Sequence, residues 1–136
     1  MSQLMKSRTI SISIAATPAA VYEFVSNPEN MPKWARGFAK SVTPAQDGWI
    51  VETATGPVTL RFAARNALGV LDHRVSLPQG LEINNPMRVV ANGSGSELLF
   101  TLFQTGNLSD TELAAEAELV NNDLHTLKQV LESEYA

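Results

Sequence analysis

Six apolar residues near the C-terminus recur at alternating steps of four and three: Leu113, Ala117, Val120, Leu124, Leu127 and Leu131. This spacing predicts one apolar stripe along an α-helix of about 25 residues, roughly 37 Å long. The preceding Ser109-Asp110-Thr111-Glu112 matches a capping box, in which Ser and Glu each bond the other's backbone amide. An amphipathic helix of this length needs a large partner surface, which the rest of the chain must supply.

Strand patterns that could provide this surface fill most of the remaining sequence. Residues 8–14 alternate strictly between polar and apolar, which indicates a strand with one buried face. Apolar, β-branched and aromatic runs then predict further strands at 37–42, 49–53, 58–64, 68–77, 81–91 and 97–105, with a turn at 44–48. Turns about every 8–12 residues are typical of an antiparallel meander. Pro86 requires its strand to lie at an edge or to carry a bulge.

Two short helices are predicted between the first strand and this meander. Thr17 is a good N-cap residue, and Pro18 is tolerated at the first helical position. Val21, Phe24 and Val25 give the first helix an apolar face. Asn27-Pro28 ends it and opens a second helix that runs through Trp34, where Met31 and Trp34 share a face and could cap a cavity mouth.

Several local strings in this framework resemble the START/Bet v 1-like (SRPBCC) superfamily, in its bacterial polyketide cyclase/dehydrase-like branch. They are residues 17–22 (TPAAVY), 27–34 (NPENMPKW), 69–75 (GVLDHRV), 86–89 (PMRV) and 93–97 (GSGSE). The resemblance covers about residues 6–132 and implies an α+β helix-grip fold in a single domain, 1–136. In that fold a curved antiparallel sheet of about 6–7 strands wraps around the long C-terminal helix. The resemblance also implies a cavity between the two.

Composition excludes several kinds of chemistry. The chain has no cysteine, so disulfides, thiolate zinc sites and a cysteine nucleophile are excluded. Two histidines without metal-ligand spacing, and no phosphate-binding glycine motif, predict neither metal nor cofactor. The net charge of −4 disfavours nucleic acid as a partner. Without a signal-like start or an apolar run of about 20 residues, a cytoplasmic protein with no membrane span is expected.

The more apolar alternate side of each strand, together with the helix stripe, identifies the residues that should face the interior. From these we predict ten ligand-binding residues: Trp34, Phe38, Trp49, Leu60, Phe62, His73, Met87, Phe100, Val120 and Leu124. Ligand pockets are lined mainly by apolar and aromatic side chains, and this set has that character. Ordinary packed cores have it as well, so the composition of the set fits both.

His73 is the most informative member of this set, because it shares a strand face with Leu71 and Val75 and should point inward. It is either a core histidine with hydrogen-bonded nitrogens or a polar anchor for a ligand. It is also the candidate catalytic residue, as a general acid or base. Asp72 and Arg74 should point the other way, which leaves His73 without a carboxylate to orient it.

Three functions are consistent with these features. The first is the binding of a small hydrophobic or aromatic molecule in the cavity. The second is a polyketide cyclase/dehydrase-like enzyme that uses the same cavity, with His73 moving protons. The third is a protein-interaction domain that uses the acidic residues of the helix, which should lie opposite its apolar stripe. An open sheet edge would also permit a homodimer.

Overall fold

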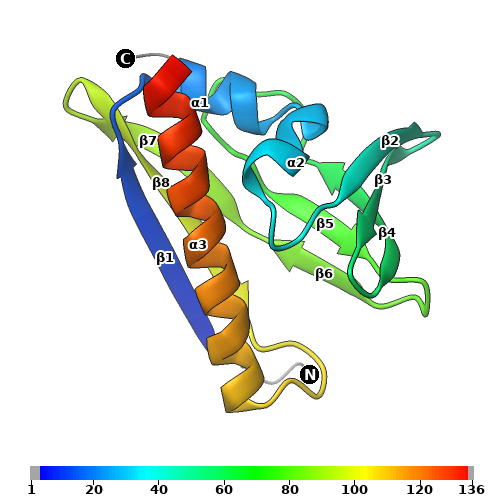
Figure 1. The fold of residues 1–136 in the computed structure, drawn as a ribbon. Coiled ribbons are helices and arrows are strands. Elements are labelled where there is room, and N and C mark those ends of the chain that lie inside the picture. The colour runs from blue at the N-terminus through cyan, green and yellow to red at the C-terminus, as the bar shows by residue number, and fades with distance from the viewer. Residues whose placement is uncertain (1–3, 135–136) are drawn as a thin grey trace.

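A computed structural model describes residues 4–134 of the chain (Figure 1). In this range the elements are β1 (Ser7–Ile14), α1 (Pro18–Val25), the 3-10 turn η1 (Pro28–Asn30), α2 (Met31–Trp34), β2 (Ser41–Ala45), β3 (Gly48–Thr53), β4 (Gly56–Phe62), β5 (His73–Ser76), β6 (Glu82–Asn85), β7 (Met87–Asn92), β8 (Gly95–Phe103) and α3 (Asp110–Glu134). This order confirms the predicted α+β helix-grip fold, with two short helices after the first strand and one long helix at the end.

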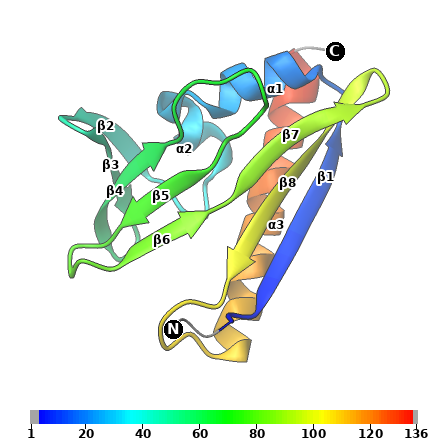
Figure 2. The ribbon, with the colours of Figure 1, turned by 180° about the vertical axis from the view of Figure 1, so that it is seen from behind.

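The strands form two antiparallel sheets instead of one continuous sheet. One has the order β1-β8-β7, and the other has the order β2-β3-β4-β5-β6. The sheets meet where β6 continues into β7, and they diverge from there (Figures 1 and 2). α3 lies across the sheet of β1, β8 and β7, while α1 and α2 cover the end at which the sheets meet.

Pro86 divides the predicted strand 81–91 into β6 and β7. Proline has no N–H to donate to a neighbouring strand. The next amide, of Met87, donates to the Asp72 carboxylate at 2.8 Å, and the Met87 carbonyl accepts from Leu71 N at 2.8 Å. Residues 68–72 therefore bond to β7, so that the predicted strand 68–77 becomes regular only at His73. The side chain of Asp72 thus replaces a missing ladder acceptor at the junction.

The predicted strand 37–42 is wrong in its bounds, because β2 begins at Ser41. Residues 35–39 form a turn in which Phe38 N and Ala39 N both donate to the Ala35 carbonyl. Pro44, expected in the following turn, lies inside β2. β2 is an edge strand, so the missing N–H of Pro44 costs no ladder bond on a side that has no neighbouring strand.

Both predicted helix starts are confirmed. Thr17 Oγ1 accepts from Ala20 N at 3.2 Å, and Pro18 occupies the first turn of α1. At α3, Ser109 N donates to Glu112 Oε1 at 2.9 Å, and Glu112 N donates to Ser109 Oγ at 3.1 Å. These bonds satisfy amides that a helix leaves free at its N-terminus.

α3 is 25 residues long and buries its predicted stripe. Five of the six stripe residues are buried, and Val120 is half-buried. The helix makes its main contacts with β1 and α2.

In residues 4–134, no helix has the length and apolar character needed to cross a membrane.

One acidic residue does not lie on the solvent face where the sequence analysis placed it. Asp123 is only 9% exposed, and its Oδ1 accepts from Gly37 N at 3.0 Å. A Cβ at position 37 would lie 3.2 Å from this oxygen, so the glycine permits the close approach. Burial raises the pKa of Asp123, and the Gly37 amide opposes that rise. The hydrogen bond between Asp123 and Gly37 therefore links α3 to the turn before β2.

Candidate ligand-binding site

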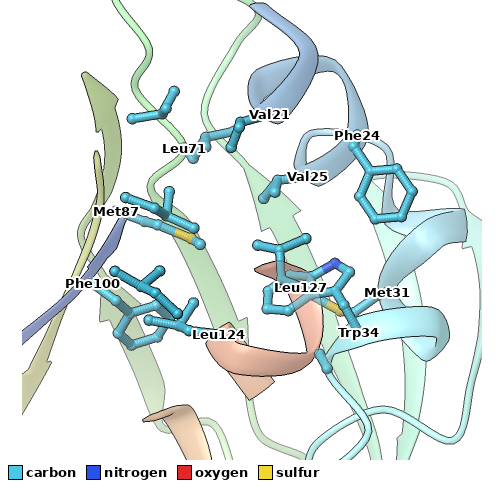
Figure 3. Packing of buried hydrophobic residues seen from close by; sticks show 14 of the residues in the cluster. Val21, Phe24, Val25, Met31, Trp34, Leu71, Met87, Phe100, Leu124 and Leu127 are labelled. Atoms are coloured by element: carbon cyan, nitrogen blue, oxygen red, sulfur yellow. The ribbon is translucent and has the colours of Figure 1, made fainter. Parts of the chain in front are cut away.

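Most of the ten residues predicted to bind a ligand belong to the packed core. Six of them are between 0 and 7% exposed: Trp34, Leu60, His73, Met87, Phe100 and Leu124. They pack with residues from α1 and α3, among them Val21, Val25 and Leu127 (Figure 3). A ligand could touch these six only after side chains move aside.

The other four predicted residues remain half-buried against the core: Phe38, Trp49, Phe62 and Val120. Ile83 of β6 lies on the same inner face of the sheet and is also half-buried. These positions lie on β3, β4, β6, α3 and the turn before β2, so they belong to both the second sheet and α3. Because α3 packs mainly on β1 and α2, it leaves the inner face of β2–β6 incompletely covered.

A hollow of about 430 Å³ opens beside this face. Its lining residues are Ser26, Pro28, Gln46, Asp47, Gly48, Trp49, Arg61 and Phe62. They come from the end of α1, the start of η1, the β2–β3 turn, the start of β3 and the end of β4. The hollow thus lies at the side of the second sheet and does not extend beneath α3, where the sequence analysis expected the cavity.

A second hollow, of about 100 Å³, adjoins the first. It is lined by Tyr22, Ser26, Phe62, Ala63, Arg65, Val70 and Leu71. Ser26 and Phe62 line both hollows, and we call the two together the α1 furrow. At this end Arg65 forms an ion pair with Glu23, and its guanidinium lies 5.4 Å from the centre of the Tyr22 ring. The charge of Arg65 is therefore already compensated.

Sequence reasoning found Trp49 and Phe62 but missed the polar residues of the furrow. Ser26, Asp47 and Arg61 belong to separate elements whose patterns indicate a helix end, a turn and an outer strand face. Their meeting depends on how the chain folds between them. Only the turn composition around Asp47 hinted that the chain reverses direction there.

His73 is enclosed and fully hydrogen-bonded. Its Nδ1 lies 3.1 Å from the Leu71 carbonyl, which can only accept, so Nδ1 carries the proton. Nε2 is then the acceptor and faces Asn85 Nδ2 at 3.4 Å. The ring packs between Phe62 and Phe100, with centroid distances of 5.2 and 5.7 Å. Burial lowers the pKa of the imidazole.

These contacts fit a neutral histidine of the core. Asp72 bonds the Met87 amide, and the two partners of the imidazole among the described residues are the Leu71 carbonyl and the Asn85 amide. No contact in the structure tests a catalytic role, which stays a hypothesis.

Trp34 has an unusual place in the core. Among residues 4–134, its Nε1 is the one buried side-chain nitrogen or oxygen without a hydrogen-bond partner. The indole lies beside Leu127 and Met31 (Figure 3), where apolar side chains offer no acceptor. A buried unsatisfied donor costs about 1–3 kcal/mol.

We therefore expect Trp34→Phe to change the free energy of unfolding by less than about 1 kcal/mol, because relief of the unsatisfied N–H offsets the lost packing. Trp34→Ala, which removes the packing as well, should cost about 3–5 kcal/mol. Urea unfolding followed by circular dichroism measures both. A loss above about 2 kcal/mol for Trp34→Phe would show that the indole N–H has a partner in solution.

The same architecture occurs in solved structures of low sequence identity. XoxI from Bacillus cereus aligns with a TM-score of 0.75 at 15% identity, covering 93% of this chain and 96% of that chain. Ara h 8.0201 gives 0.72 at 15% identity, with 96% and 99% covered. The Aha1 protein from Colwellia psychrerythraea, solved as a dimer, gives 0.69 at 17% identity, with 94% and 97% covered. At these identities the likeness establishes the fold alone.

The match of most of the chain to a family model, together with this fold, places the chain among the helix-grip proteins of the Bet v 1-like (SRPBCC) superfamily, as the sequence predicted. Residues 5–132 match the family described as polyketide cyclase / dehydrase and lipid transport, and the chain belongs to this family. No curated protein matches the sequence.

Proposed function

We propose that the protein binds a small hydrophobic or aromatic molecule against the inner face of β2–β6. The observation that carries this proposal is that apolar side chains on this face stay half-buried although they point toward the interior. Trp49, Phe62 and Ile83 from the sheet, and Val120 from α3, are of this kind. The description of the family, with its cyclases, dehydrases and lipid transport, supports an apolar ligand.

Apolar area left in contact with water supplies the driving force. Removing apolar surface from water is worth roughly 25 cal/mol per Å². A ligand that covers these side chains therefore gains free energy in proportion to the apolar area it buries. A single exposed apolar residue carries no such meaning, because folded proteins expose many. The proposal rests on several residues of this kind, two of which, Trp49 and Phe62, also line the hollow of about 430 Å³.

Binding is favoured here over the cyclase/dehydrase alternative. A proton shuttle needs a nitrogen that reaches the substrate, whereas both ring nitrogens of His73 already have partners. Glu116 and Glu118 of α3 are exposed, as an interaction surface requires, and the protein-interaction domain stays a hypothesis.

The test uses N-phenylnaphthylamine, an uncharged probe whose fluorescence rises in apolar surroundings. Wild-type protein should bind it saturably. Ile83→Gln should weaken the dissociation constant about fivefold, because roughly 1 kcal/mol of apolar contact is lost. Ile50→Gln is the matched control, because Ile50 lies on the outer face of β3 in the same sheet and is 40% exposed.

Ile50→Gln should leave the dissociation constant unchanged. The proposal fails if the wild type shows no saturable binding, or if the two substitutions weaken binding equally. Unfolding curves of both variants must show that each is folded at the temperature of the titration.

A further inference from the structure

We propose that the bound molecule is an apolar carboxylic acid whose carboxylate is held by Arg61 at the mouth of the α1 furrow, with its apolar part on Trp49 and Phe62. This inference rests on the proposed function and specifies the ligand class. It follows from the geometry of Arg61, from the charges around it and from the residues that share its hollow.

Arg61 lines the furrow, and among residues 4–134 its guanidinium has no carboxylate partner. Its Nε donates to the Asp47 carbonyl at 3.1 Å, which ties the group to the β2–β3 turn. Among residues 4–134 no hydrogen bond or ion pair engages its two terminal nitrogens. A guanidinium fixed at Nε with free terminal nitrogens is arranged to donate two hydrogen bonds to one carboxylate.

Arg61 does not stabilise the sheet through its cross-strand neighbour. Arg61 stands directly opposite Arg74 in the β4–β5 ladder. Like charges at opposing positions destabilise a sheet. Arg74 has Glu82 nearby, with Arg74 Nη1 4.0 Å from Glu82 Oε1, whereas Arg61 has no such carboxylate. A carboxylate bound in the furrow would compensate the charge of Arg61.

Asp47 is the one acidic residue that lines the hollow. Its carboxylate is not within ion-pair distance of Arg61, so it leaves the guanidinium fork free. A negative neighbour nevertheless weakens the attraction for any anion. We therefore expect a site that needs both the ion pair and apolar contact and does not bind inorganic anions tightly.

Trp49 and Phe62 provide this apolar contact. Both line the hollow with Arg61 and are half-buried. Phe62 also lines the second hollow and packs against His73. A volume of about 430 Å³ is within the range of small-molecule pockets, roughly 300–1,000 Å³. The apolar part of the ligand can thus extend from the charged mouth toward the inner face of the sheet.

The experiment compares naphthylacetic acid with its neutral amide, naphthylacetamide, by calorimetric titration near neutral pH. Wild-type protein should bind the acid about tenfold more tightly than the amide, as expected for a charge-assisted pair at a partly exposed site. Arg61→Gln should remove this preference and leave the affinity for the amide unchanged. Arg74→Gln is the matched control, and it should retain the preference.

Arg61→Gln should also unfold at the same or a higher urea concentration than the wild type, because it removes the opposing charge of Arg74. If it does, weaker binding of the acid by Arg61→Gln cannot be explained by unfolding of the variant. Equal wild-type affinity for acid and amide would overturn this inference and leave the proposed function standing. Absence of binding for both compounds would also overturn this inference, and the proposed function would then be decided by the N-phenylnaphthylamine titration. A preference that survives in Arg61→Gln would exclude Arg61 as the anchor.

Discussion

Leu127→Ala should lower the free energy of unfolding by about 3 kcal/mol, within the range of about 2–5 kcal/mol found for buried leucines. Leu127 is 0% exposed and lies in the apolar stripe of α3, beside Trp34 and Met31 (Figure 3). Truncation removes the transfer free energy of the side chain and leaves a cavity that its close-packed neighbours can fill only in part. Urea unfolding followed by circular dichroism measures the loss.

Leu119→Ala is the matched control for this substitution. Leu119 is on the same helix but is 49% exposed, so its truncation should change the free energy of unfolding by less than about 0.5 kcal/mol. Similar losses for the two variants would contradict the way α3 faces the rest of the protein. The difference between them measures how firmly α3 is held over β1 and α2.

Acidification below about pH 6.5 should destabilise the protein by up to about 1.4 kcal/mol per pH unit through His73. Burial lowers the pKa of His73 in the folded state below its ordinary value of 6.5. Between the folded and the unfolded pKa, the unfolded chain binds a proton that the folded protein does not. The free energy of unfolding therefore falls as the pH drops through this window, and it is highest above the unfolded pKa.

Asp123 acts in the opposite direction. Burial raises the pKa of Asp123, so the folded state holds its proton to higher pH than the unfolded state does. Asp123→Asn removes this contribution while an amide oxygen can still accept from Gly37 N. The test is best made in that background combined with His125→Gln, which leaves His73 as the only histidine.

Urea unfolding of this double variant should show lower stability at about pH 5.5 than at about pH 7. Imidazole NMR signals of the folded protein should show that the His73 ring takes up its proton at a lower pH than the ordinary pKa of 6.5 would give. A ring that titrates near pH 6.5 in the folded state would contradict the enclosed environment described here.

Sequence patterns predicted those parts of the fold that depend on interactions between residues close together in the chain. The spacing of the α3 stripe, the two helix caps and the strand alternation each depend on residues within a few positions, and the structure has all of them. Alternation also placed His73 inward, because a strand turns every second side chain to the same face.

The failures are at contacts between distant segments. Pro86 signalled a disturbance, but the pattern did not show that the Asp72 side chain would accept from Met87 N where the two sheets meet. The pattern of the long helix places its acids in solvent, whereas the carboxylate of Asp123 accepts from Gly37 N, 86 positions away. The α1 furrow was missed for the same reason, because Arg61 lies on the outer face of β4, as its pattern indicates, and joins the furrow only through its bond to the β2–β3 turn.

The proposal of a small apolar ligand on the inner face is tested most directly by NMR of labelled methyl groups during titration with N-phenylnaphthylamine. We expect saturable shifts at Ile83 and Val120, which are half-buried and point into the space between sheet and helix. The exposed Ile50 and Leu119 should not shift. Shifts confined to these exposed methyl groups, or no saturable shift at Ile83 and Val120, would contradict the proposal.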